Sequence, residues 1–199
     1  AEISGVRNAM KMRPALAAQI GVTMSFFCAE TPPTKATLSL LEVFKEDPSK
    51  LSSLRYRGYG WPGFFTVSEP NGESREHWIY QKSWAYLQKF RPWAVHMWPD
   101  GAGELADISC GDPWYEEPDG KNPGFSLVVA RTERGKRIIE AAIEAGYLQA
   151  TVAEPWKLAN SQSGLLDKKG SVWGRRVVAK TLGLPVTELK GVDLFRIWR

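Results

Sequence analysis

Apolar residues recur with two different periods along this chain, and the two periods predict alternating helices and strands. The clearest helix is expected at residues 133–146, with Thr132 as its N-cap and Gly146 at its C-terminal end. The clearest strand, "FSLVVART" at residues 125–132, directly precedes it. We predict further helices at residues 13–21, 34–47, 82–90 and 171–185, and further strands at 22–28, 77–81, 104–110 and 147–152. This alternation predicts an α/β fold, a mixed β-sheet flanked by helices in a single domain.

Composition narrows the class of protein without identifying it. The 199 residues fit one domain, and 43% apolar and 24% charged residues are ordinary for a globular protein. The chain contains no apolar run near the length of a membrane span and no signal segment. Two cysteines fit a reducing cytoplasm. The chain does not begin with Met, so we expect it to be an excerpt of a longer protein.

The net charge of +4 indicates a solvated surface with a modest preference for anions, and no nucleic-acid partner. Neither histidine belongs to a zinc-ligand pair, and the nucleophile motif G-x-S-x-G of hydrolases is absent. Zinc enzymes and serine hydrolases are therefore disfavoured.

Three predicted strands end in residues suited to binding an anion. The first ends at Cys28 and leads to Thr34 and Lys35 at a helix start, where we expect Thr34 to be the N-cap. The others end in Asp107-Ile108-Ser109-Cys110-Gly111-Asp112 and in Arg131-Thr132. Ligands of open α/β sheets bind beyond the carboxyl ends of strands, where helix N-termini attract phosphate. We expect the three ends to share one edge of the sheet, with plain helix caps as the alternative.

A second candidate lies in "RYRGYGWPG", residues 55–63. Arg55 and Arg57 are two residues apart, so they share one face if the segment is a strand. Guanidinium groups interleaved with aromatic rings suit a flat, anionic, conjugated ligand. A twisted strand with a glycine bend is the alternative reading.

Four motifs in order, "FFCAETPPTKATLSLL", "LRYRGYGWPG", "WPDGAGELADISCGDPWY" and "NPGFSLVVARTERGKRIIEAA", give the chain a family resemblance. It resembles the C-terminal domain of the coenzyme F420 hydrogenase/dehydrogenase beta-subunit family, which includes 7-hydroxymethyl chlorophyll a reductase. The resemblance implies a C-terminal flavin-binding domain over residues 1–199, FAD, usually 4Fe-4S clusters, and a redox partner such as reduced deazaflavin or ferredoxin. It also implies a missing N-terminal domain or partner subunit.

The chain departs from the family pattern R-C-x-x-C-P-D, since Ala94, Val95 and Trp98 stand at the arginine and the two cysteine positions. Valine and tryptophan cannot ligate iron, which takes thiolate or, less often, imidazole. A 4Fe-4S cluster held by this chain alone is therefore not expected. Cys28 and Cys110 remain possible ligands of a cluster shared with a missing domain.

Two functions stay open on the sequence. The first is an FAD-dependent oxidoreductase or electron-transfer subunit, with the flavin held by Thr34, Lys35, Arg55, Arg57, Asp107, Ser109, Asp112, Arg131 and Thr132. The second is a non-redox binding or interaction module on the same scaffold, with bacterial polysaccharide biosynthesis as one setting for it.

Overall fold

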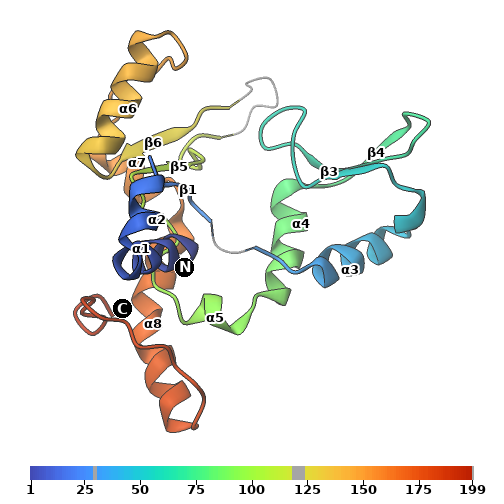
Figure 1. Ribbon diagram of the computed structural model, residues 1–199. Helices are drawn as coiled ribbons and strands as arrows, with labels where there is room; N and C mark the ends of the chain where they lie inside the picture. The colour runs from blue at the N-terminus through green and yellow to red at the C-terminus, as the bar shows by residue number, and fades with distance from the viewer. Residues whose placement is uncertain (29–30, 118–123, 199) are drawn as a thin grey trace. The chain divides into compact units, whose positions relative to one another are not determined.

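The computed structural model describes residues 1–28, 31–117 and 124–198, apart from the side chain of Ser163. Contacts divide the chain into two compact units, each with its own three-stranded sheet (Figure 1). The mixed-sheet unit comprises Ala1–Ala29, Ala94–Tyr115 and Ser126–Arg199. The antiparallel unit comprises Glu30–Trp93 and Glu116–Phe125.

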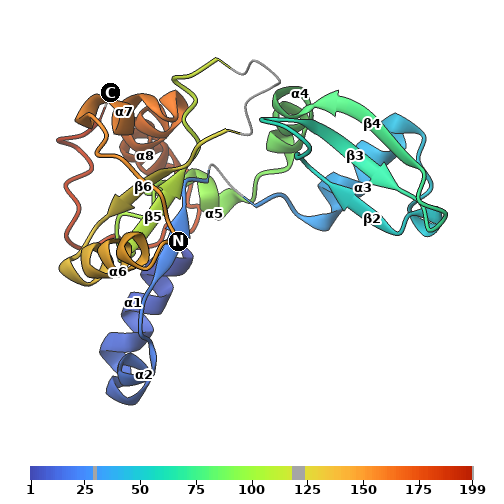
Figure 2. The same ribbon diagram turned by 90° about the horizontal axis from the view of Figure 1, so that it is seen from above.

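The mixed-sheet unit is built on the strand order β1-β5-β6. Its elements are α1 (Glu2–Met12), α2 (Pro14–Gln19), β1 (Met24–Phe26), β5 (Ile108–Gly111), β6 (Leu127–Ala130), α6 (Glu133–Glu144), α7 (Pro155–Asn160) and α8 (Ser163–Thr181). Helix α5 (Trp93–His96) begins at the last residue of the antiparallel unit's first segment. Figure 2 shows α6 on one side of this sheet and α7 with α8 on the other.

Strand directions in this sheet correct one prediction. β1 is parallel to β5, whereas β6 is antiparallel to β5 with Ala130 opposite Ile108. The carboxyl end of β6 therefore lies beside the amino ends of β1 and β5. The expectation that three strand ends share one edge is wrong for Arg131 and Thr132, because strand direction depends on pairing that a local pattern does not encode.

The α/β class with a mixed sheet and flanking helices is confirmed. The strand predicted at residues 147–152 is wrong, since that segment has no regular structure. Tyr147 and Val152 are almost fully exposed there, so no neighbouring strand covers their side chains. Among the described residues, no helix has the length and apolarity needed to cross a bilayer.

The antiparallel unit has the strand order β2-β3-β4 and its own apolar core. Its elements are α3 (Thr34–Phe44), the short 3-10 helices η1 (Pro48–Lys50) and η2 (Gln88–Phe90), β2 (Ser53–Arg55), β3 (Phe64–Ser68), β4 (Ser74–Ile79) and α4 (Tyr80–Leu87). The buried core residues come from α3, β3 and α4: Ala36, Leu40, Leu41, Phe65, Val67 and Leu87. Burial of these side chains stabilises the unit.

A network of charged side chains joins the segment after α3 to β4 in this unit. Glu46 accepts hydrogen bonds from Arg75 Nε and Nη2 at 2.9 and 2.7 Å and lies 2.8 Å from His77 Nε2. The Arg75 guanidinium, followed by His77, lowers the pKa of Glu46 below its ordinary value. The His77 ring also stacks on Phe44, so this histidine has a structural role.

Two details predicted for this unit are wrong. Thr34 is the first residue of α3 and makes no capping hydrogen bond, because Pro33 occupies the N-cap position. Arg55 and Arg57 do not share a strand, because β2 ends at Arg55. The chain then bends through residues with positive φ, among them Gly58 and Tyr59, which ends the alternation of strand side chains.

Candidate functional site

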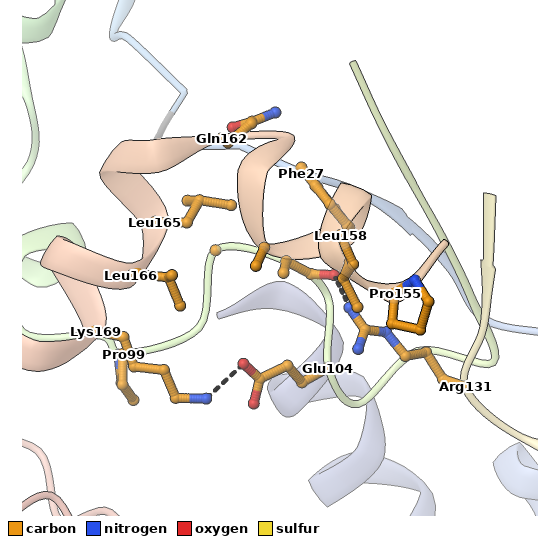
Figure 3. A pocket seen from close by; sticks show the side chains of 13 residues that line it. Phe27, Pro99, Glu104, Arg131, Pro155, Leu158, Gln162, Leu165, Leu166 and Lys169 are labelled. Atoms are coloured by element: carbon orange, nitrogen blue, oxygen red, sulfur yellow. Dashed lines mark hydrogen bonds and ion pairs between the residues drawn. The ribbon is translucent and has the colours of Figure 1, made fainter. Parts of the chain in front are cut away.

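A pocket of about 270 Å³ lies within the mixed-sheet unit, between the loop before β5 and helices α7 and α8 (Figure 3). Its walls are mainly apolar and include Phe27, which directly follows β1, and Leu158, Leu165 and Leu166 of the two helices. The remaining lining residues are Pro99, Gly101, Ala102, Glu104, Arg131, Pro155, Ala159, Gln162 and Lys169. An apolar cavity with a few polar groups is the usual form of a small-molecule site.

Arg131 supplies the pocket with a positive charge held by neutral partners. Its Nε donates to Ser109 Oγ at 3.0 Å, and its Nη2 donates to the Ala102 carbonyl at 3.1 Å. Among the described residues, no carboxylate forms an ion pair with Arg131. A half-buried guanidinium without a counter-ion favours an anionic ligand, because charge-assisted hydrogen bonds are stronger than neutral ones.

Ser109 and Arg131 were both predicted as ligand contacts, and the structure brings these two side chains together. Ser109 is fully buried, so its hydroxyl contacts the guanidinium from inside the protein and fixes the orientation of that group. Arg131 itself lines the pocket.

The other end of the pocket carries an ion pair. Lys169 Nζ of α8 lies 2.6 Å from Glu104 Oε1 (Figure 3). Close packing joins this helix to the loop, since a Cβ added at Gly101 would come within 2.5 Å of Leu165 Cδ2 and 3.1 Å of the Cys28 carbonyl oxygen. Glycine at 101 therefore allows α8 to approach closely enough to form the wall.

Asp107, which is buried, and Thr132, which is exposed, lie in a separate hydrogen-bond network. Asp107 Oδ2 accepts from the Thr23 amide at 2.9 Å and the Thr23 hydroxyl at 2.8 Å. Its Oδ1 accepts from the Thr132 hydroxyl at 2.8 Å and lies 3.2 Å from Arg7 Nη2. Burial alone would raise the pKa of Asp107, but the hydrogen bonds from Thr23, Thr132 and Arg7 outweigh it and lower that pKa.

The same contacts define what Thr132 does. Its hydroxyl accepts from the Gly135 amide, which confirms Thr132 as the N-cap of α6. With the carboxylate of Asp107 on one side and the Gly135 amide on the other, this hydroxyl is engaged within the protein. A phosphate contact at Thr132 stays a prediction.

The predicted contacts of the antiparallel unit lie on its surface. Thr34 and Lys35 are exposed in the first turn of α3. Arg55 stacks over the Tyr59 ring at 4.6 Å, and Arg57 stacks over the Tyr80 ring at 5.3 Å. The guanidinium–aromatic pairing expected from "RYRGYG" is therefore present, as two separate stacks.

The residues that remain at the cluster-pattern positions do not fit a 4Fe-4S cluster. Val95 lies in α5, and Trp98 follows it as a half-buried side chain whose indole Nε1 is buried with no hydrogen-bond partner among the described residues. Burial raises the pKa of the Cys110 thiol, which disfavours the thiolate that iron needs. Within the described ranges, no group of three His, Cys, Asp or Glu residues could hold a metal ion.

Near these positions, Cys28 and Asp112 lie just beyond the carboxyl ends of β1 and β5, which are parallel neighbours. The Cys28 amide donates to the Gly101 carbonyl at 2.8 Å, and the Asp112 carbonyl accepts from the Trp114 amide. The prediction that strand ends meet at one edge of the sheet therefore holds for β1 and β5. A ligand role for Asp112 stays a prediction.

Sequence reasoning missed the far wall of the pocket. Leu158, Leu165 and Leu166 come from α7 and α8, and in sequence they are ordinary apolar residues of a helical segment. Lys169 belongs to no recognisable sequence motif, because its ion-pair partner Glu104 lies 65 residues away in the chain.

Comparison of the sequence with known proteins identifies the family of this chain. Residues 2–155 match the family described as the C terminus of the beta subunit of coenzyme F420 hydrogenase/dehydrogenase. The coenzyme F420 hydrogenase subunit beta of Methanococcus voltae is 36% identical over 95 residues, which cover 47% of this chain and 32% of that protein. The chain thus spans about a third of the relative it matches, and most of α7 and all of α8 lie outside the family range. On the match to residues 2–155, the chain belongs to the family formed by the C-terminal part of coenzyme F420 hydrogenase/dehydrogenase beta subunits.

Proposed function

We propose that this chain is the flavin-binding part of an electron-transfer subunit that works without a 4Fe-4S cluster of its own. The single observation that carries the proposal is a cation in an apolar pocket, Arg131, which forms no ion pair with any described residue, in a chain whose family consists of hydrogenase and dehydrogenase beta subunits. Neither the family match nor the relative supports the alternative of a non-redox binding module.

The pocket fits part of FAD. Its volume of about 270 Å³ is near the lower end of small-molecule sites, enough for one portion of a dinucleotide and too small for all of it. A flavin bound here would supply the hydride or electron chemistry. Arg131 would neutralise a negative charge on the bound portion, and Phe27, Leu158 and Leu165 would exclude water from it.

The remaining predicted residues extend this proposal. Within the mixed-sheet unit, Asp112 is a further proposed cofactor contact, and Asp107 with Thr132 supports the turn that precedes α6. Thr34, Lys35, Arg55 and Arg57 are proposed as cofactor-binding residues of the antiparallel unit, taken by itself. The partner is proposed to be a redox carrier such as reduced deazaflavin or ferredoxin. The relative's name, a coenzyme F420 hydrogenase subunit, supports a redox partner of this class.

Replacing Arg131 with Gln is expected to weaken FAD binding about tenfold or more, because the variant loses a charge-assisted hydrogen bond. The measurement is a titration with FAD in which quenching of the flavin fluorescence reports binding to the protein. Arg137→Gln is the matched control, since Arg137 lies exposed on α6 and does not line the pocket.

Two results would contradict the proposal in different ways. Absence of FAD binding by the unmodified protein would remove the flavin function itself. Equal affinity in the folded Arg131→Gln variant would leave a flavoprotein whose cofactor lies outside this pocket.

A further inference from the structure

The positive charge of this protein is concentrated at its C-terminal end. Residues 163–199 contain eight Lys and Arg residues against three Asp and Glu residues, a net charge of +5, whereas residues 1–162 carry a net charge of −1. The net charge of +4 is therefore unevenly distributed along the chain. These residues also lie outside the range matched by the family.

Helix α8 has an apolar outer face. Its inner face is packed, since Val172, Arg176 and Ala179 are at least nine-tenths buried. On the opposite side Val177 and Val178 are 42% and 58% exposed. A helix that covers a core normally presents polar residues to water. Exposed valines at these positions therefore indicate a binding surface for another molecule or a membrane.

The C-terminal tail returns along α8 (Figure 1). Two of its aromatic residues, Phe195 and Trp198, pack against Trp173 of this helix. The ring centroid of Trp173 lies 4.6 Å from that of Trp198 and 5.1 Å from that of Phe195. Arg176 Nη2 donates to the Thr187 carbonyl, which fastens the tail to the helix. The rings of the tail still face water, with Phe195 64% and Trp198 51% exposed.

Exposed cations flank this aromatic face, which we define as Trp173, Val177, Val178, Phe195 and Trp198. Arg175 and Lys180 lie on either side of the apolar stripe of α8, at the angles that 3.6 residues per turn give them. Arg196 is next to Phe195 in the tail. A second copy of the chain is a poor occupant, because two such faces would bring like charges together.

We propose that the aromatic face binds the surface of a membrane that contains anionic phospholipids. Tryptophan is favoured at the boundary between lipid and water, and apolar side chains beside Lys and Arg are typical of surfaces that lie on a bilayer. A bilayer also accepts an irregular apolar surface without the shape complementarity that a protein partner needs. The inference is independent of the flavin proposal.

The test is sedimentation of the protein with two kinds of vesicle, pure phosphatidylcholine and an equal mixture of phosphatidylcholine and phosphatidylglycerol. Binding to the mixed vesicles is expected to be at least about tenfold stronger and to weaken as salt is raised. The double variant Lys180→Glu/Arg196→Glu is expected to lose at least about tenfold in affinity for the mixed vesicles. Phe195→Ala/Trp198→Ala is expected to weaken binding at every salt concentration.

The matched control is Lys136→Glu/Arg137→Glu on α6, which changes the net charge equally on exposed positions away from the aromatic face. This control is expected to bind like the unmodified protein. Equal binding to both vesicles, no binding to either, or an equal loss in the control would overturn the proposal. Self-association or capture of an acidic protein through this face, without vesicle binding, would also overturn it.

Discussion

Replacing Asp107 with Ala is expected to destabilise the mixed-sheet unit by about 3–5 kcal/mol, the range for removing the buried member of a charged, hydrogen-bonded network. Asp107 is 3% exposed, and its carboxylate accepts from both the amide and the hydroxyl of Thr23 and from the hydroxyl of Thr132. Without it these donors and Arg7 lose their shared acceptor inside the unit. The measurement is the free energy of opening from hydrogen exchange of the β5 and β6 amides.

The effect also has a predicted pH dependence. The folded-state pKa of Asp107 is lowered, so its ionised network stabilises the fold above the unfolded pKa of about 4. That stabilisation is lost as pH falls through the folded pKa, and the difference between wild type and Asp107→Ala should shrink below about pH 4. Asp167→Asn on the exposed side of α8 is the control. A loss under about 1 kcal/mol at neutral pH for Asp107→Ala would contradict the network.

Replacing Phe65 with Ala is expected to destabilise the antiparallel unit by about 3–5 kcal/mol, the usual range for removing a buried phenylalanine. Phe65 is fully buried, and its ring lies 5.4 Å from that of Phe44 and 5.7 Å from that of Tyr56. The variant leaves a cavity between β3 and the two helices that cover it. Hydrogen exchange of the β3 and β4 amides measures the loss.

Phe64→Ala is the matched control for this prediction. Phe64 is the preceding residue of the same strand, next to a register shift between Phe64 and Thr66, and its side chain is 39% exposed where that of Phe65 is fully buried. The expected cost of Phe64→Ala is under about 1.5 kcal/mol. Similar costs for the two variants would mean that Phe65 is not the buried core residue described here.

The parts of the fold that could be predicted from sequence are those set by local chemistry. Helix α6 follows from its apolar period, the Thr132 cap and Gly146, whose φ of 76° suits glycine. The strand predicted at 147–152 failed because Tyr147 and Val152 have strand-forming side chains but no partner strand. Propensity for a strand has little effect without pairing.

Parts of the site depended on tertiary structure that no local pattern encodes. Arg131 and Ser109 were predicted as separate contacts, and their hydrogen bond follows from the antiparallel pairing of β5 with β6. The spacing of Arg55 and Arg57 indicated one face only on the assumption that the strand continued past Arg55. Leu165 and Lys169 were missed because a helix becomes a pocket wall only through what packs against it.

The cofactor content of the purified 199-residue chain tests the central claim most directly. After anaerobic purification and incubation with FAD, we expect about one bound flavin per chain, with absorbance near 450 nm, and iron and acid-labile sulfide far below stoichiometric amounts. About four irons and four sulfides per chain would contradict the absence of a cluster, and a colourless protein that retains no flavin would contradict the proposed function.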